Sequence, residues 1–282
     1  MSISANPKKI KALALDLDGT ILAPGAVLSE RSIRAVKACR QRGLRIIIAT
    51  GRAIDAAERF RTALDAEGPM IYFNGVVVAE MPGGRILSST LMDKEAAAFG
   101  VDISREMGVY YQVFFPAGNK EGNITLMAEQ DAPERKIYYN HTGILAELGD
   151  LKEALNRPGL EGCIKSMFLA EPELHAALRL KFDERFSKSV YIAQTLKNFL
   201  EIMDAKVSKG QGLKLVMEHC SLKSEEVLAF GDEENDLPMF AAAGFSAAPS
   251  NAKDSVKAAA DMVIGSNAED GVAAFLEEFF GL

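Results

Sequence analysis

Four aspartates, Asp16, Asp18, Asp232 and Asp236, follow closely after two apolar runs that are typical of buried strands. In an open parallel sheet, ligands bind outside the carboxyl ends of the strands, so we expect these side chains to meet at one edge. Carboxylates that lie so close together are unstable unless a cation neutralises them. Oxygen ligands with no His or Cys nearby suit Mg²⁺. The four aspartates therefore predict a magnesium site.

The spacing of Asp16 and Asp18 adds a chemical possibility to this site. Residues i and i+2 of a strand point the same way, so both carboxylates can face one ligand. A carboxylate held beside Mg²⁺ can attack phosphorus and form an acyl phosphate. The second carboxylate can protonate the leaving oxygen and later activate water. Gly19 permits the sharp turn that must follow the pair.

Other residues at strand ends and helix starts could hold a phosphate group. Thr50 and the backbone amide of Gly51 follow the second predicted strand, and such groups bind phosphate at a helix N-terminus. Lys209 follows Ser208 at the start of a predicted helix and could add a fixed positive charge. Each residue alone is more often a turn residue or a solvated lysine. Their occurrence together, in the order that a parallel sheet requires, favours a shared site.

The elements that must position these residues alternate between strand and helix in the first part of the chain. Strands are predicted over 12–17, 44–49 and 70–73, with helices after Ser29 and over 54–66 between them. This order predicts a parallel sheet with right-handed crossovers. The last part resumes the rhythm, with predicted helices over 208–219, 237–242, 253–259 and 271–280 and predicted strands over 227–230, 245–248 and 262–264.

The middle of the chain has a different pattern. Strands of alternating character are predicted over 110–115, 124–128, 163–169, 190–195 and 199–203, with helices over 95–107 and 173–186. Such alternation is typical of an antiparallel sheet. We therefore predict an α/β fold with a Rossmann-like parallel-sheet core, residues 1–90 and 205–282, interrupted by an inserted α+β cap domain, residues 91–204.

The composition narrows the partners and the location. The chain has 282 residues and a formal net charge of −7, which disfavours non-specific binding to nucleic acid or to an anionic membrane. Its three cysteines show no CxxC spacing. Residues 1–9 are polar, and no apolar stretch approaches the roughly 18–20 residues that span a bilayer. We expect a cytoplasmic protein that needs no membrane or nucleic-acid partner.

These motifs resemble those of the haloacid dehalogenase (HAD) superfamily. The four motifs of that superfamily are matched, in order, by Asp16-Leu17-Asp18-Gly19-Thr20, Thr50-Gly51-Arg52, Lys209 and Gly231–Asp236. The Cof-type branch, which carries a large class IIB cap between its second and third motifs, is matched further by Asn74-Gly75, Val207-Ser208-Lys209-Gly210, Asn251-Ala252 and Gly271-Val272. The motifs cover most of the predicted core, whereas the cap matches in size and position alone.

The resemblance implies roles for the acidic residues. Asp16 is implied as the nucleophile and as a ligand of Mg²⁺, and Asp18 as the general acid and base that also binds Mg²⁺ through its backbone carbonyl. Asp232 is implied as the third protein ligand, and Asp236 as a supporting carboxylate on the metal side. The implied enzyme is a phosphoric monoester hydrolase that forms an aspartyl-phosphate.

The resemblance also implies how a substrate is held. The residues implied to hold the transferred phosphoryl group are Thr50, Gly51, Lys209 and Asn235, and those implied nearer the leaving group are Arg52 and Asn74. The implied substrates are small phosphorylated metabolites, with sugar phosphates first and flavin mononucleotide, pyridoxal phosphate or a riboflavin-pathway intermediate next. Candidate contacts from the cap are Arg135, Lys136, His141 and Lys165, but no substrate code is readable there. The oligomeric state is not predicted.

Two alternatives stay open beside hydrolysis. One is a transferase similar to phosphohexose mutases, and the other is a catalytically silent binding protein of the same fold. The intact set of Asp16, Asp18, Lys209 and Asp232 argues against the silent protein. A dehalogenase lacks the Asp-x-Asp pair, and a transport ATPase of this superfamily carries Lys at the position of Asp18.

Overall fold

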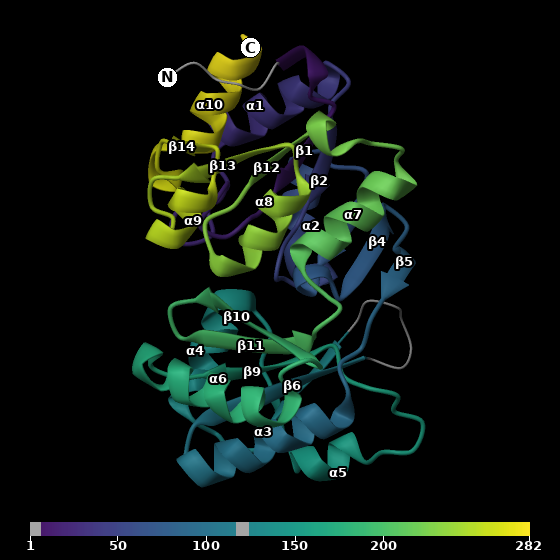
Figure 1. Cartoon of the computed structure of the whole chain (residues 1–282), viewed down its shortest axis with the longest axis vertical. Helices are drawn as coiled ribbons and strands as arrows, with labels where there is room; N and C mark the ends of the chain where they lie inside the picture. Colours follow the sequence, from purple (N-terminus) through teal and green to yellow (C-terminus); the bar gives the residue numbers. More distant parts are fainter. Residues whose placement is uncertain (1–6, 117–123) are drawn as a thin grey trace. The chain divides into compact units, whose positions relative to one another are not determined.

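The computed structural model describes residues 7–116 and 124–282, which form two compact units (Figure 1). The first unit contains the chain up to Gly51, together with Ala57–Leu87 and Ser208–Leu282. The second contains Arg52–Ala56 and Ser88–Val207. The long insertion thus forms a unit with its own sheet, and each unit is described separately below.

A five-stranded parallel sheet forms the centre of the first unit, in the order β14-β13-β12-β1-β2. Its strands are β1 (Ala12–Leu15), β2 (Arg45–Ile48), β12 (Val227–Phe230), β13 (Phe245–Pro249) and β14 (Met262–Ile264). Every residue of β1 and β12 is buried, as expected for parallel strands covered on both faces. The predicted α/β fold with a parallel central sheet is confirmed.

Helices connect these strands. They are α1 (Glu30–Gln41), α2 (Ile54–Ala63), α7 (Lys209–His219), α8 (Leu237–Ala242), α9 (Asp254–Ala259) and α10 (Gly271–Phe280). Short 3₁₀ turns lie at η1 (Pro7–Lys9), η2 (Phe73–Gly75), η3 (Ser224–Glu226), η4 (Glu234–Asp236) and η5 (Asn267–Glu269). Ser208 caps α7, because its Oγ accepts a hydrogen bond from the backbone N–H of Gln211 at 3.1 Å. This cap fixes where α7, and with it Lys209, begins.

The third predicted strand does not extend the parallel sheet. It forms β3 (Gly68–Tyr72), which touches the edge of the sheet through a bridge between Ala49 and Ile71. It pairs antiparallel with β4 (Val77–Met81), and β5 (Arg85–Ser89) completes a separate three-stranded sheet. The chain reverses at Asn74 and Gly75, whose φ angles are +58° and +102°. The sequence analysis did not predict β4 and β5.

The second unit is a six-stranded sheet in the order β10-β11-β9-β6-β7-β8, antiparallel except for the pair β7 and β8. Its strands are β6 (Tyr110–Pro116), β7 (Ile124–Ala128), β8 (Glu147–Leu148), β9 (Lys165–Leu169), β10 (Val190–Leu196) and β11 (Phe199–Asp204). Its helices are α3 (Lys94–Met107), α4 (Pro133–Thr142), α5 (Leu151–Leu155) and α6 (Pro172–Phe186). Tyr111, Phe168 and Phe182 belong to the apolar core between this sheet and its helices.

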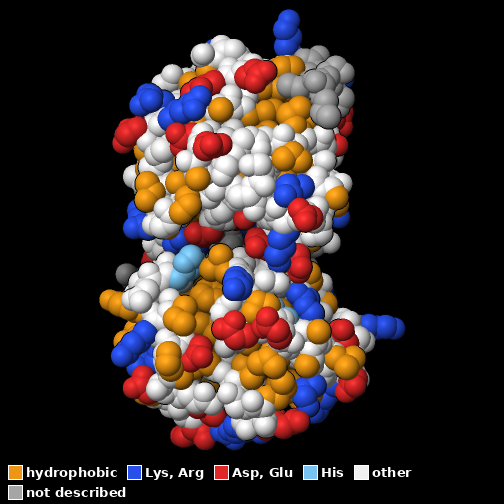
Figure 2. Space-filling model, turned by 90° about the vertical axis from the view of Figure 1, so that its left-hand side faces the viewer, with side chains coloured by type: hydrophobic (Ala, Val, Ile, Leu, Met, Phe, Trp, Pro, Cys, Tyr) orange, Lys and Arg blue, Asp and Glu red, His pale blue; other side chains and the backbone are white. Residues whose placement is uncertain are grey.

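The surface matches the sequence composition. On the face that Figure 2 shows, acidic and basic side chains of the described residues are interspersed. Among helices within 7–116 and 124–282, none combines the length and the apolar character needed to cross a membrane.

Candidate active site

The sheet register places two of the predicted aspartates at the same edge. Leu15 ends β1 opposite Phe230, which ends β12. Asp16 follows directly, and its backbone N–H donates to the carbonyl of Phe230 at 3.1 Å. Asp232 comes two residues after Phe230, and only 5% of Asp16 and 8% of Asp232 is exposed. Both carboxylates are therefore buried at the carboxyl ends of adjacent central strands.

Asp236 completes a cluster of three buried carboxylates. Asp16, Asp232 and Asp236 each offer a carboxylate oxygen, and these oxygens all lie within 4.8 Å of one another. The Oδ2 of Asp236 also accepts hydrogen bonds from the backbone N–H groups of Asp232, at 2.9 Å, and Glu233, at 3.1 Å. Asp236 thus shapes the loop after β12 while its other oxygen stays available to the cluster.

Lys209 brings a positive charge into the cluster from the first residue of α7. Its Nζ lies 2.6 Å from Oδ1 of Asp16 and 2.7 Å from Oδ1 of Asp236, and the side chain is 1% exposed. Burial alone would lower the pKa of Lys209, but the two carboxylates raise this pKa above its ordinary value. The ammonium group therefore stays charged.

The balance of charge indicates room for a further cation. Burial raises the pKa of Asp16, the nearby Asp236 and Asp18 raise it further, and Lys209 only partly offsets this. Burial and the same neighbouring carboxylates also raise the pKa of Asp232. One ammonium does not neutralise several buried carboxylates, and the donor set consists of oxygen atoms alone. This chemistry fits a hard divalent metal ion.

Two residues of the first motif shape the position of Asp232. The hydroxyl of Thr20 donates to Oδ1 of Asp232 at 2.7 Å. Gly19 has a φ angle of +80°, and a Cβ there would lie 2.1 Å from Oδ2 of Asp232. The sequence analysis quoted Thr20 in the motif without giving it a role. The available signal was a hydroxyl residue in the turn directly after the acidic pair.

The residues expected to hold phosphate lie beside one another at the neighbouring strand ends. The backbone N–H of Asn74 donates to the carbonyl of Thr50 at 3.0 Å. The Oδ1 of Asn74 accepts from Nδ2 of Asn235 at 2.9 Å, and a Cβ on Gly51 would lie 3.1 Å from that same oxygen. The Oδ1 of Asn235 is buried and has no hydrogen-bond partner among the described residues. Such an atom is costly unless a ligand or water completes its bonding.

The remaining predicted residues lie in segments assigned to the second unit. Arg52 is buried, and its role stays a prediction. Lys165 forms a buried ion pair with Glu201, with 2.6 Å between Nζ and Oε1. The Nε of Arg135 donates to the carbonyl of Ala146 at 2.7 Å. Lys136 is exposed. These contacts hold the cap residues within their own unit.

Comparisons with known proteins agree with this arrangement. A family model of haloacid dehalogenase-like hydrolases matches residues 13–276. The chain is 30% identical to the 5-amino-6-(5-phospho-D-ribitylamino)uracil phosphatase YwtE of Bacillus subtilis, over 95% of this chain and 98% of that protein. It is 28% identical to the pyridoxal phosphate phosphatase YbhA of Escherichia coli, over 94% and 97%.

Solved structures share the whole fold. The structure of the HAD subclass IIB sugar phosphatase BT4131 matches with a TM-score of 0.81 and 24% identity, covering 95% of this chain and 98% of that chain. At this identity the match concerns the fold, and it extends through the inserted unit as well as the parallel-sheet unit.

Proposed function

This chain belongs to the haloacid dehalogenase-like hydrolase family, and we propose that it is a Mg²⁺-dependent phosphatase that acts through an aspartyl-phosphate on Asp16. The observation that carries the proposal is the buried cluster in which Lys209 contacts Asp16 and Asp236 while Asp232 lies within ligand distance of both carboxylates. Hydrolases of this family generally use a divalent metal. The identity of that metal and the covalent intermediate are the proposed steps.

The proposed ligands are the carboxylates of Asp16 and Asp232 and the backbone carbonyl of Asp18, with Asp236 in support. When bound, the metal would supply positive charge that offsets the charge of the phosphate oxygens. Thr20 would hold Asp232 in its ligating orientation through the hydroxyl contact at 2.7 Å.

The first proposed step is attack by Asp16. A carboxylate oxygen of Asp16 bonds to phosphorus, and the bond between phosphorus and the leaving oxygen breaks. Protonated Asp18 gives its proton to the leaving oxygen, which departs as an alcohol. Lys209 contacts Oδ1 of Asp16 and holds the carboxylate in place. The products of this step are the aspartyl-phosphate and ionised Asp18.

The second proposed step returns the enzyme to its starting state. Asp18, now ionised, accepts a proton from a water molecule, whose oxygen attacks phosphorus. The bond between phosphorus and the Asp16 oxygen breaks and inorganic phosphate leaves. Asp16 is again ionised and Asp18 again protonated, so atoms and charges balance over the two steps. Thr50, Gly51 and Asn235 are proposed to hold the phosphoryl group throughout.

The proposed substrates are small phosphorylated metabolites. Two relatives over the full length of this chain are named as phosphatases of a phosphoribitylamino-uracil and of pyridoxal phosphate. We place sugar phosphates first and flavin mononucleotide and pyridoxal phosphate next. A cytoplasmic location and independence from nucleic acid and membranes remain predictions from composition.

Phosphate release from para-nitrophenyl phosphate, with Mg²⁺ and with EDTA, tests the proposal. We expect turnover that requires Mg²⁺ and that falls at least about 10³-fold in Asp16→Asn, because the nucleophile is lost. Asp254→Asn, which removes a fully exposed carboxylate, is the matched control and should retain activity. Absence of Mg²⁺-dependent turnover with this ester and with a metabolite panel would favour the silent binding protein. Transfer of the phosphoryl group to a sugar in preference to water would favour the mutase-like transferase.

A further inference from the structure

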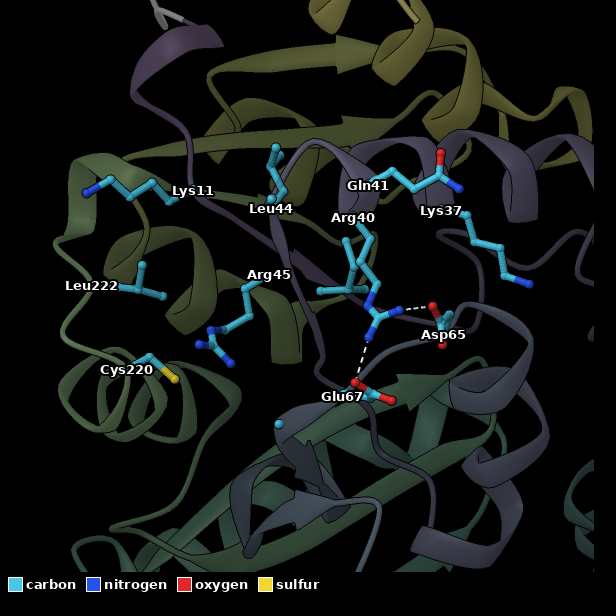
Figure 3. A pocket seen from close by; sticks show the side chains of 13 residues that line it. Lys11, Lys37, Arg40, Gln41, Leu44, Arg45, Asp65, Glu67, Cys220 and Leu222 are labelled. Carbon is cyan, nitrogen blue, oxygen red and sulfur yellow. Dashed lines mark hydrogen bonds and ion pairs between the residues drawn. The ribbon is translucent and has the colours of Figure 1, made fainter.

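A second cavity, of about 630 Å³, lies at the opposite edge of the parallel sheet of the first unit (Figure 3). Its walls include Arg45 at the start of β2, Gly68 at the start of β3, and Gln41 and Cys220 at the ends of α1 and α7. These are amino-terminal strand ends, whereas Asp16 lies at a carboxyl-terminal end. The four residues of β1 separate the two edges by about 13 Å.

Four cations and two carboxylates line this cavity, and the cations differ in their pairing. Arg40 forms ion pairs with Asp65 and with Glu67, the latter at 2.6 Å between Nη2 and Oε2 (Figure 3). Lys11 pairs with Glu226, outside the lining. Lys37 and Arg45 form no hydrogen bond or ion pair with any residue in the described part of the chain. The lining therefore holds two cations that lack a counter-charge.

The helix ends at the cavity do not cancel this charge. α1 and α7 both end at this edge, and each carboxyl-terminal helix end contributes about −0.5 of an elementary charge. The sum of about −1 is smaller than the two charges of Lys37 and Arg45. Lys37 and Arg40 are also three residues apart on one face of α1, so both point to the same region. The cavity keeps a net positive charge in a chain whose formal net charge is −7.

The guanidinium of Arg45 occupies a place that Gly68 leaves open. A Cβ at residue 68 would lie 2.8 Å from Nη1 of Arg45, so any larger residue there would displace the guanidinium. Leu44, which is buried, and the half-buried Leu222 add apolar surface to the same cavity. A planar guanidinium donates two parallel hydrogen bonds to a phosphate or carboxylate. The cavity thus combines an anion-binding fork with an apolar wall.

We propose that this cavity binds a small organic anion, a phosphate or carboxylate group attached to an apolar body, at a site separate from the catalytic edge. The anionic group contacts Arg45 and Lys37, and the apolar body packs against Leu44 and Leu222. A cavity of this volume is within the range of small-molecule sites, about 300–1,000 Å³.

Cys220 provides a local probe, because it lines the cavity and is half-buried while Cys39 and Cys163 are buried. The experiment measures the rate at which a thiol reagent labels Cys220 in EDTA, with increasing phenylphosphonate, benzoate or the neutral benzyl alcohol. Neither acid can be hydrolysed by a phosphatase. We expect at least one acid to slow labelling saturably, and benzyl alcohol to do so at least about tenfold more weakly. Comparing the two acids distinguishes phosphate from carboxylate recognition.

Substitutions locate the effect. In Arg45→Gln and in Lys37→Gln, the concentration that gives half-protection should rise at least about tenfold, the loss of one charge-assisted contact. Lys214→Gln, an exposed lysine of α7 outside the cavity, is the matched control and should match the wild type. Rates are compared with and without the acid in each variant, because Arg45 itself lowers the pKa of Cys220. Protection by neither acid, equal protection by benzyl alcohol, or protection unchanged in both cavity variants would overturn the proposal.

Discussion

Lys209 and Asp16 form a buried ion pair with 2.6 Å between Nζ and Oδ1, although 193 positions separate them in the chain. The pair exists because α7 begins, at its Ser208 cap, beside the carboxyl end of β1. A lysine that is 1% exposed is rare unless it is paired, and here two carboxylates share it. The cluster therefore depends on Lys209 for both its stability and its proposed chemistry.

Replacement of Lys209 by Met should lower both quantities. Removing the ammonium leaves buried carboxylates without their partner, which costs about 3–5 kcal/mol of unfolding free energy in the metal-free protein. It should also lower kcat/KM at least about 10²-fold, as for the loss of a charged group at a reacting centre. Denaturant unfolding in EDTA and steady-state kinetics measure the two effects. Lys214→Met on the same helix is the control, and a Lys209 variant within twofold of the wild type in kcat/KM would refute the assigned role.

Divalent metal should stabilise the folded protein. Mg²⁺ that binds the carboxylate cluster and not the unfolded chain raises the unfolding free energy by about 2.7 kcal/mol at one hundred times its Kd. We expect the Tm to rise with Mg²⁺ in the wild type and in Asp254→Asn, and to rise much less in Asp232→Asn. An equal rise in Asp232→Asn would place the bound ion elsewhere.

The hydroxyl of Thr20 should tune metal affinity through Asp232. Thr20→Val keeps the side-chain shape but removes the 2.7 Å hydrogen bond to Oδ1 of Asp232. Loss of a contact to a metal ligand typically lowers metal affinity about 10–100-fold, so the Mg²⁺ concentration for half-maximal activity should rise by at least tenfold. Thr20→Ser, which keeps the hydroxyl, should restore most of the affinity. An unchanged Mg²⁺ dependence in Thr20→Val would mean that Asp232 needs no such support.

The cysteines should differ in reactivity. Burial raises the pKa of Cys39 and of Cys163 to about 12, so both remain thiols in the folded protein at pH 8. One equivalent of a thiol reagent should react with the native protein, at Cys220, and three equivalents after unfolding. Reaction of more than one thiol in the native protein would contradict the burial of Cys39 and Cys163.

The same shifts predict how stability changes at high pH. The folded-state pKa values lie above the unfolded value of about 9, so below pH 9 the thiols are protonated in both states and do not change stability. As the pH rises from about 9 to 12 the unfolded thiols ionise first, and their contribution lowers the unfolding free energy. Cys39→Ala/Cys163→Ala should show a shallower decrease than the wild type over this range. An equal slope would assign the decrease to other groups.

The strand ends were predictable because they are local patterns. The apolar run before Asp16 and the Gly-Asp after Val227–Phe230 both mark the end of a buried strand, and the parallel order follows from the alternation with helices. The hairpin of β4 and β5 was missed because Asn74 and Gly75 were interpreted as part of a binding site. Their positive φ angles also reverse the chain.

Contacts between distant segments were beyond the sequence. The hydrogen bond from Thr20 to Asp232 joins residues 212 positions apart, and no periodicity encodes such a partner. The same holds for Lys165, which the sequence placed in a cap strand without showing that Glu201 on the adjacent strand neutralises it. Residue types and strand ends thus predicted which groups converge, whereas the pairing among them required the packed structure.

The most direct test of the central proposal is to trap the phosphorylated residue. In Asp18→Asn the group that would activate water is missing, so any aspartyl-phosphate formed from a small phosphate ester with Mg²⁺ should accumulate. Quenching during turnover and reducing with borohydride converts an acyl phosphate of aspartate to homoserine, which peptide mass spectrometry locates. We predict homoserine at position 16, absent without substrate and absent in Asp16→Asn/Asp18→Asn. Reduction at another aspartate, or phosphate release by the wild type with Asp16 never modified in either protein, would contradict the proposed mechanism.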